Sequence, residues 1–352
     1  MNPGDRVTYP DLAHSLALIG RDGADAFYRG PIADAIADEM AAHGGLVTRA
    51  DLAAYAVREV EPLRGRYRDL DLAFMPFATG GVTALEVLNI LEQFPSARVD
   101  WRSPEGLHLR AHAVARAFRD RFEHLGDPDT VKAPWERLTG KDYARAVATE
   151  IRRGAPVASP RGVGGTSPDC TTHVGVVDGR RNMVSLTHTA VSLWGSRVVV
   201  PGTGILLNNG MIWFDPEPGK ANSAGPGKRP LVNMVPVLGF KRGAPHLTLG
   251  APGGRKIVSA IPQVIANVVD TKASPQGAID APRLHTEGGP VLVDDRVGEK
   301  ALASLRRRGH TVTASEESYS SMNFARPIAI RITPRGLEAG LDSFGAAAAA
   351  GR

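Results

Sequence analysis

The stretch RGVGGTSPDCTTHVGVVDG occupies residues 161–179 and marks a change in the character of the chain. Its first ten residues carry almost no apolar side chains and are rich in Gly, Ser, Thr and Pro, which is typical of an exposed linker or a processing loop. From Thr171 onward, branched apolar residues recur as in a β-strand, at Val174, Val176 and Val177. We therefore predict that a helical part ends and a strand-rich part begins at this junction.

On the N-terminal side of the junction, apolar residues recur mostly at helical spacing. We expect short helices over residues 9–54, a strand pair near 65–76, and longer helices near 82–94, 103–125 and 142–151. Two local signals fix helix starts. Thr48 is followed three residues later by Asp51, which forms a capping box, and Ser103 precedes Pro104 as an N-cap precedes a first-turn proline.

On the C-terminal side, short runs rich in β-branched residues alternate with turn residues. We expect strands near residues 174–177, 183–189, 196–200 and 246–249, and helices near 256–269 and 298–308. No internal repeat is visible at any period. The layout is thus a helical part, a loose joint and a mostly stranded part.

Composition excludes several classes of protein. Of the 352 residues, 43% are hydrophobic and 22% charged, which is ordinary globular composition and excludes a disordered or fibrous chain. The single cysteine, Cys170, excludes an internal disulfide and a cysteine-based zinc cluster. The 42 basic and 37 acidic residues are interspersed, so we expect no nucleic-acid partner.

No stretch approaches the ~18 consecutive apolar residues that a membrane span requires, so no span is expected. Residues 1–11 show neither a basic segment nor an apolar one, and no signal peptide can be read there. The sequence leaves the compartment open between the cytoplasm and the periplasm.

Several common catalytic motifs are absent: GxxxxGK[ST], HExxH and GxSxG do not occur. His108 and His112 lie four residues apart in a predicted helix and could face one metal ion. No carboxylate or third histidine accompanies them at a telling spacing. We therefore expect neither a metal nor a cofactor.

The junction itself offers a different chemistry. If the chain cleaved itself before Thr171, the new α-amine would have a pKa of about 7.7–8.0 and could accept the proton of the threonine hydroxyl. Gly253 and Gly254 follow a predicted strand and precede a predicted helix, where backbone amides can approach an oxyanion closely. Taken singly, a Thr-Thr pair and a Gly-Gly turn are weak signals.

At this point the sequence resembles the γ-glutamyltranspeptidase family of N-terminal-nucleophile hydrolases over nearly its whole length. Six blocks in order carry the resemblance: GDRVTYPDLAHSLALIGRDGADAFYRG (4–30), AFRDRFEHLGDPD (117–129), TTHVGVVDG (171–179), PGTGILLNN (201–209), GKRPLVNMVP (227–236) and LGAPGGRKIVSAIPQVIANVVD (249–270). The resemblance implies an α+β fold, namely a four-layer αββα sandwich of the N-terminal-nucleophile type. It also implies that the N-terminal part of the large subunit is missing, and a fragment, a mis-started reading frame and a reduced homologue all stay open as explanations.

The resemblance further implies self-processing between Cys170 and Thr171. Residues 1–170 would form a large-subunit-like, mostly helical part that ends in a processing loop. Residues 171–352 would form a small-subunit-like, β-rich catalytic part, and the two pieces would stay associated as a heterodimer.

The same resemblance assigns four catalytic residues. Thr171 matches the nucleophile whose hydroxyl attacks an amide, and Thr189 matches the second threonine whose hydroxyl bonds to it. Gly253 and Gly254 match the oxyanion-hole pair. The implied reaction is acyl transfer from a small-molecule amide or γ-glutamyl substrate through an acyl-enzyme, which is then hydrolysed or passed to an acceptor.

The substrate-facing blocks depart from the family. Val191 stands where the family has Asn, Gly210 and Trp213 replace Gln and the acid that binds the γ-glutamyl ammonium, and Val232-Asn233 replaces Ser-Ser. An apolar wall cannot stabilise a zwitterion. The chain therefore looks closer to the divergent branch that includes glutaryl-cephalosporin acylases and other amidohydrolases. We assign substrate contacts to Asn209, Gly210, Trp213 and Asn233.

Three functions follow from these observations. The first is a self-processing amidohydrolase of this family. The second is a true γ-glutamyl hydrolase or transpeptidase that acts on glutathione-like substrates. The third is a non-catalytic truncated remnant that keeps the strand-rich part as a scaffold.

Overall fold

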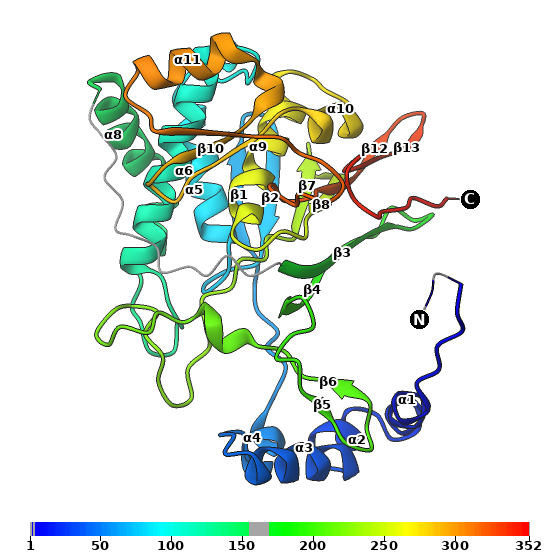
Figure 1. Cartoon of the computed structure of the whole chain (residues 1–352). Coiled ribbons are helices and arrows are strands. Elements are labelled where there is room, and N and C mark those ends of the chain that lie inside the picture. Colours follow the sequence, from blue (N-terminus) through cyan, green and yellow to red (C-terminus); the bar gives the residue numbers. More distant parts are fainter. Residues whose placement is uncertain (1, 3, 155–168, 352) are drawn as a thin grey trace. The chain divides into compact units, whose positions relative to one another are not determined.

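The computed structural model describes residues 2, 4–154 and 169–351 (Figure 1). Most of the predicted processing loop, residues 161–168, lies outside the described residues. The chain divides into two compact units, one formed by residues 1–60 and 190–209 and the other by residues 61–189 and 210–352. The predicted division at Cys170 concerns cleavage of a peptide bond and stays a prediction.

The smaller unit consists of short helices and one two-stranded sheet. Its elements are α1 (Pro10–Asp22), α2 (Ala24–Tyr28), α3 (Pro31–Ala42), α4 (Arg49–Ala54), β5 (Val199–Val200) and β6 (Ile205–Leu206). Ile32, Ile36 and Val200 form its small core. The predicted capping box is confirmed: the Thr48 hydroxyl accepts from the Asp51 amide (3.2 Å), and the Asp51 carboxylate accepts from the Thr48 amide (2.8 Å).

The larger unit is built on a six-stranded antiparallel sheet of order β1-β2-β7-β8-β12-β13. Its strands are β1 (Leu63–Tyr67), β2 (Leu70–Phe74), β7 (Val237–Lys241), β8 (Ala244–Gly250), β12 (Ile328–Thr333) and β13 (Gly336–Leu341). A smaller sheet has the order β11-β10-β9 and consists of β9 (Leu284–His285), β10 (Val291–Asp294) and β11 (Val312–Ser315).

Helices of this unit pack against the six-stranded sheet and against one another. They are α5 (Gly81–Glu92), α6 (Pro104–His124), α7 (Trp135–Leu138), α8 (Lys141–Arg152), α9 (Lys256–Asp270), α10 (Pro275–Asp280) and α11 (Glu299–Arg307), with the short 3-10 helices η1 (Ser96–Arg98), η2 (Gly210–Trp213) and η3 (Asp295–Val297). The predicted cap of α6 is confirmed, because the Ser103 hydroxyl accepts from the Gly106 amide at 2.9 Å. Among the described helices, none combines the length and apolar character needed to cross a membrane.

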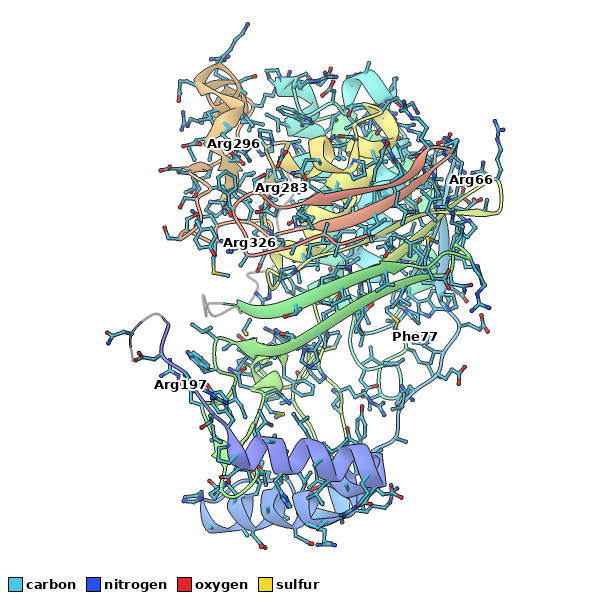
Figure 2. All side chains as sticks on the ribbon, turned by 90° about the vertical axis from the view of Figure 1, so that its right-hand side faces the viewer. Arg66, Phe77, Arg197, Arg283, Arg296 and Arg326 are labelled. Atoms are coloured by element: carbon cyan, nitrogen blue, oxygen red, sulfur yellow. The ribbon has the colours of Figure 1, made fainter. Side chains whose placement is uncertain are left out.

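Strands β3 (Asp169–Val177) and β4 (Met183–Ser192) pair only with each other among the described strands and form a separate β layer (Figure 2). Side chains link this layer to the larger sheet: the Ser185 hydroxyl donates to the Leu249 carbonyl, and the Thr248 hydroxyl donates to the Val184 carbonyl, both at 3.0 Å. The described chain is therefore α+β with two β layers face to face, as predicted. The layer also exposes apolar side chains, namely Val174, Val176, Val184 and Leu186.

One contact fixes how closely β3 approaches the larger sheet. The His173 side chain points inward from β3, and only 4% of the residue is exposed. A Cβ atom on Gly250, the last residue of β8, would lie 2.1 Å from Cε1 of the His173 ring. Gly250 is thus required for space rather than for backbone conformation, because any side chain there would push β3 outward.

Substituting Gly250 with alanine tests this packing. We expect Gly250→Ala to lower the free energy of unfolding by ~1–3 kcal/mol, since the added methyl group overpacks a closed contact. Gly179→Ala is the matched control, because a Cβ there meets nothing within 4 Å. The measurement is denaturant-induced unfolding, and equal stabilities of the two variants would contradict the described contact.

Candidate active site

Two threonines and a carbonyl group form a chain of hydrogen bonds between β3 and β4. Oγ1 of Thr171 donates to Oγ1 of Thr189 at 3.0 Å, and Oγ1 of Thr189 donates to the Cys170 carbonyl oxygen at 2.7 Å. The Thr189 hydroxyl thereby orients the oxygen of Thr171 and polarises the carbonyl of the bond at which cleavage is predicted. The structure brings together the three residues that the sequence assigned to nucleophile, helper and cleavage site.

His173 lies two residues after Thr171 on the same, inward face of β3. Its Nδ1 is 2.9 Å from the Thr187 hydroxyl, and its Nε2 is buried with no partner recorded in the described part of the chain. Burial lowers the pKa of His173 from 6.5 to about 4, so the ring is neutral at pH 7. The TTH motif alone gives His173 no role, because Gly250, against which its ring packs, lies far along the chain.

The predicted oxyanion pair lies between β8 and α9. Gly253 and Gly254 have positive φ angles of 135° and 55°, and a Cβ on Gly253 would lie 2.5 Å from Cα of Ala325. No acceptor is recorded among the described residues for the amide groups of this pair. Free amides just before the N-terminus of a helix suit a developing negative charge.

A small cavity brings Trp213 and Asn233 together. It measures about 30 Å³ and is lined by Arg121, Phe122, Trp213, Phe214, Asp215, Asn222, Leu231, Asn233 and Arg255. Such a volume accepts a small polar group rather than a whole substrate. Gly210 begins the 3-10 helix η2 that ends at Trp213. Arg255 directly follows Gly254, so the cavity adjoins the predicted oxyanion pair along the chain.

Asn222 holds the loop that carries Trp213. Its side-chain amide donates to the Trp213 carbonyl at 2.7 Å, and its side-chain oxygen accepts from the Leu231 amide at 2.9 Å. One side chain therefore joins both ends of the 213–231 loop. The link holds the backbone at Trp213, from which the indole projects.

The charges around the cavity favour an anion. Arg255 pairs with Glu287 at 2.9 Å, and Asp215 pairs with Lys220 at 3.1 Å. Arg121 is buried, and it donates to the Thr79 and Val232 carbonyls and to the Asn233 side-chain oxygen rather than to a carboxylate. Burial, with the nearby Arg255 charge, lowers the pKa of Arg121 to about 9, which leaves it protonated at pH 7.

Arg121 was missed as a site residue, although it lies within the quoted AFRDRFEHLGDPD block. A buried arginine is a signal only once its burial is known. From sequence alone, this residue could equally face solvent on a long helix.

Asn209 belongs to the smaller unit and contacts Ser192 within it. Its side-chain oxygen accepts from the Ser192 amide at 3.0 Å, and its side-chain amide donates to the Ser192 hydroxyl at 2.8 Å. These bonds brace the turn that follows β4. The predicted contact of Asn209 with substrate stays a prediction.

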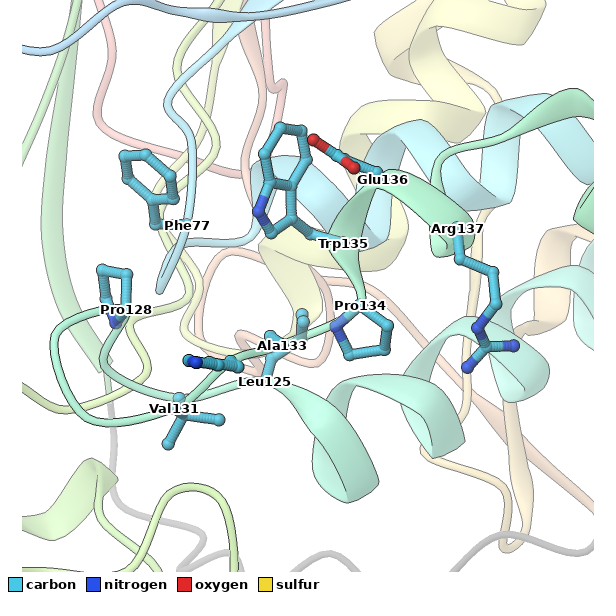
Figure 3. A pocket seen from close by; sticks show the side chains of 11 residues that line it. Phe77, Leu125, Pro128, Val131, Ala133, Pro134, Trp135, Glu136 and Arg137 are labelled. Carbon is cyan, nitrogen blue, oxygen red and sulfur yellow. The ribbon is translucent and has the colours of Figure 1, made fainter.

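A larger cavity contains none of the residues assigned to the chemistry. It measures about 520 Å³ and is bordered by Phe77 and by the segment from Leu125 to Arg137, with Trp135 beside Phe77 (Figure 3). Its walls are mostly apolar. Its volume falls in the range of small-molecule sites.

Known proteins resemble this chain over most of its length. The sequence model of γ-glutamyltranspeptidase matches residues 1–352. The chain belongs to the γ-glutamyltranspeptidase family. It is 39% identical over 324 residues to the acylase ACY 1 proenzyme of Pseudomonas sp. strain SE83, covering 92% of this chain and 58% of that protein. It is 37% identical over 341 residues to the glutathione hydrolase proenzyme of Escherichia coli K12, covering 92% and 59%.

Among solved structures, the fold resembles that of a cephalosporin acylase from Bacillus halodurans. The TM-score is 0.86 with 31% sequence identity, over 97% of this chain and 63% of that one. The predicted α+β fold of the N-terminal-nucleophile type is thus confirmed. The chain spans about three fifths of the length of these relatives.

The neutral, buried His173 predicts a specific pH dependence of stability. Its pKa is about 4 when folded and 6.5 otherwise, so the unfolded chain binds the extra proton between these values. The free energy of unfolding therefore keeps its full value above pH 6.5. It falls by about 3 kcal/mol in total as the pH decreases toward 4, at ~1.4 kcal/mol per pKa unit. His173→Gln should flatten this slope when unfolding is measured from pH 7 to pH 4.

The measurement is best made on the Thr171→Ala background, which is expected to stay in one piece. His43→Gln is the control for removal of a histidine, because its ring is exposed directly after α3. A slope that survives His173→Gln would contradict the assignment.

Proposed function

We propose that this chain carries the catalytic machinery of a self-processing amidohydrolase, with Thr171 as nucleophile. The observation that carries the proposal is the hydrogen-bond chain from Thr171 through Thr189 to the Cys170 carbonyl. Membership of the family supports it, as do relatives named as acylase and glutathione hydrolase proenzymes.

The first step in this proposal is cleavage of the chain. The Thr171 hydroxyl attacks the Cys170 carbonyl carbon and passes its proton to the peptide nitrogen of Thr171, which leaves as an amine, so an ester replaces the amide. Water then hydrolyses the ester, which leaves a carboxylate on Cys170 and restores the Thr171 hydroxyl. Thr189 donates to the carbonyl oxygen on which charge develops.

The freed α-amine of Thr171 then serves as the base for turnover. It accepts the proton of its own hydroxyl, which attacks the carbonyl of an external amide. The amides of Gly253 and Gly254 stabilise the oxyanion, and the amine product leaves with the proton. The acyl-enzyme is hydrolysed by water or transferred to an acceptor, and the two cleaved pieces remain associated as a heterodimer.

The acyl group that fits best is a dicarboxylic monoamide that lacks an α-ammonium, such as a glutaryl amide. Trp213 places an indole where the family has an acid, and an ammonium against it would lack a partner. Arg121 donates its hydrogen bonds to carbonyl and amide oxygens, and the nearby Glu287 carboxylate, which is paired with Arg255, offsets its charge only in part. A distal carboxylate of the acyl group would satisfy both Arg121 and Asn233.

A γ-glutamyl amide is the second candidate. Asp215 lines the same cavity, and a relative named glutathione hydrolase is 37% identical over 92% of this chain. Asp215 is already paired with Lys220, however, so binding an ammonium there requires that pair to break. This cost favours the desamino acyl group.

Self-cleavage is tested by one denaturing gel. We expect the full-length protein to give two pieces, the second starting Thr-Thr-His on N-terminal sequencing. Thr171→Ala should abolish cleavage and turnover, and Thr189→Val should slow both by ~10²-fold or more, as loss of one oriented donor does. Thr172→Ala is the matched control, because the Thr172 side chain lies on the exposed face of β3. A chain that stays whole would favour the non-catalytic remnant.

The acyl preference is tested by comparing kcat/KM for glutaryl- and γ-glutamyl-p-nitroanilide on the full-length, processed protein. We expect the glutaryl compound to lead by at least about 10-fold, or ~1.4 kcal/mol. Trp213→Asp should move the ratio toward the γ-glutamyl compound. Met211→Asp places the same charge two residues away on an exposed side chain and should not. A clear preference of the unmodified protein for the γ-glutamyl compound would contradict this and favour a γ-glutamyl hydrolase or transpeptidase.

A further inference from the structure

Three histidines from distant parts of the sequence meet at one place in the larger unit. His108 and His112 lie one turn apart on α6, so both rings leave the same side of the helix. His310 joins them from the turn between α11 and β11. This third residue is almost two hundred positions away, which is why spacing in the sequence gave no metal site.

The turn that presents His310 is built by local chemistry. Gly309 ends α11 with a positive φ of 89°, its amide bonds to the Arg306 carbonyl, and the His310 amide bonds to the Leu305 carbonyl. This pair of bonds is the Schellman motif, which stops a helix and fixes the direction of the next residue. Leu302 and Leu305 are buried where α11 packs against α6, so the turn has a defined position over the two helix histidines.

The three rings are close enough to share one ion. Their centroids lie 4.4 Å (His108 to His112), 5.0 Å (His108 to His310) and 5.1 Å (His112 to His310) apart. One nitrogen from each ring lies within 4.8 Å of the other two. Nδ1 of His108 is 2.8 Å from Nε2 of His310.

Hydrogen bonding among the histidines explains only part of this cluster. A neutral ring can donate to its neighbour, which accounts for His108 and His310. It leaves out His112, of which only 9% is exposed and whose Nδ1 has no recorded partner in the described part of the chain. A buried polar atom left without a partner is destabilising, and a bound ion would give it one.

The surroundings suit neutral, metal-binding rings. Burial first, and then the His310 ring and Arg308, lower the pKa of His108 to about 4. Burial and the other two rings lower the pKa of His112 to about 3. Burial and Arg308 also lower the pKa of His310. Glu105, one turn before His108 on α6, opposes this only in part and is itself paired with Arg98.

We propose that His108, His112 and His310 form a binding site for a divalent transition-metal ion, with Zn²⁺ as the best fit. Three imidazoles and one open position are a common zinc ligand set. Nitrogens around tetrahedral zinc at 2.0–2.1 Å lie about 3.3 Å apart, so binding replaces the His108–His310 hydrogen bond and requires small ring rotations. The bound ion would tie α6 to the start of β11.

This site contains none of the residues in the proposed catalytic machinery, so its test is independent of that proposal. Tag-free full-length protein is treated with a chelator and titrated with Zn²⁺ in competition with a chromophoric chelator. We expect one equivalent to bind, and Co²⁺ in its place to give the visible absorption of a tetrahedral site. Zn²⁺ should also raise the midpoint of thermal unfolding.

His310→Asn should weaken binding by more than the ~10- to 100-fold that loss of an outer-shell partner causes. It should also abolish the thermal shift. His310 is only half-buried, so the variant is expected to fold, and His108→Gln provides a second test. His43→Asn controls for binding by a surface histidine, and Thr171→Ala should bind zinc normally. Absence of stoichiometric binding, or binding that survives both cluster variants, would overturn the proposal.

Discussion

The position of Thr171 depends on one close contact, the packing of the His173 ring over Gly250. The β3–β4 layer is joined to the larger sheet by a few side-chain hydrogen bonds, so its depth is set mainly by what its inward side chains meet. The ring fills the space that the absent Cβ leaves, and a charged ring there would have no recorded counter-charge in the described part of the chain. This packing thereby fixes the position of the Thr171 hydroxyl, two residues earlier on β3, where it donates to Thr189.

Buried charge sets the polarity of the neighbouring cavity. Arg121 donates to carbonyl oxygens from two separate segments and to the Asn233 side-chain oxygen, so it ties these segments together while keeping its charge. Such a group is costly to bury unless all its donors are used and an anion lies nearby. The arrangement leaves a positive charge beside the cavity that Trp213 and Asn233 line.

Local chemistry made much of the fold predictable. Three local features could be predicted because each signal lies within four residues of the chain. They are the Thr48 capping box, the Ser103 cap and the Gly-Gly turn before α9. The strands β6, β7 and β9 to β13 escaped prediction. β6 and β9 have only two residues each, and β10 pairs with β11, which lies beyond α11 in the sequence, so no local signal marks these pairings. The same reason hid the two most informative side chains: Arg121 gains its meaning from burial beside Val232, and His310 from its place over α6.

The structure also separates what must stay fixed from what can vary. The hydroxyl chain is carried by the backbone register of β3 and β4, whereas the substrate wall is carried by a loop that Asn222 closes at Trp213 and Leu231. In the proposed function, a change in that loop would alter which acyl group is accepted while Thr171 and Thr189 stay in place. The two parts adjoin along the chain at Gly254 and Arg255, where an oxyanion donor is followed by a cavity-lining guanidinium. Such a separation is consistent with acylases and glutathione hydrolases standing at similar distance from this chain.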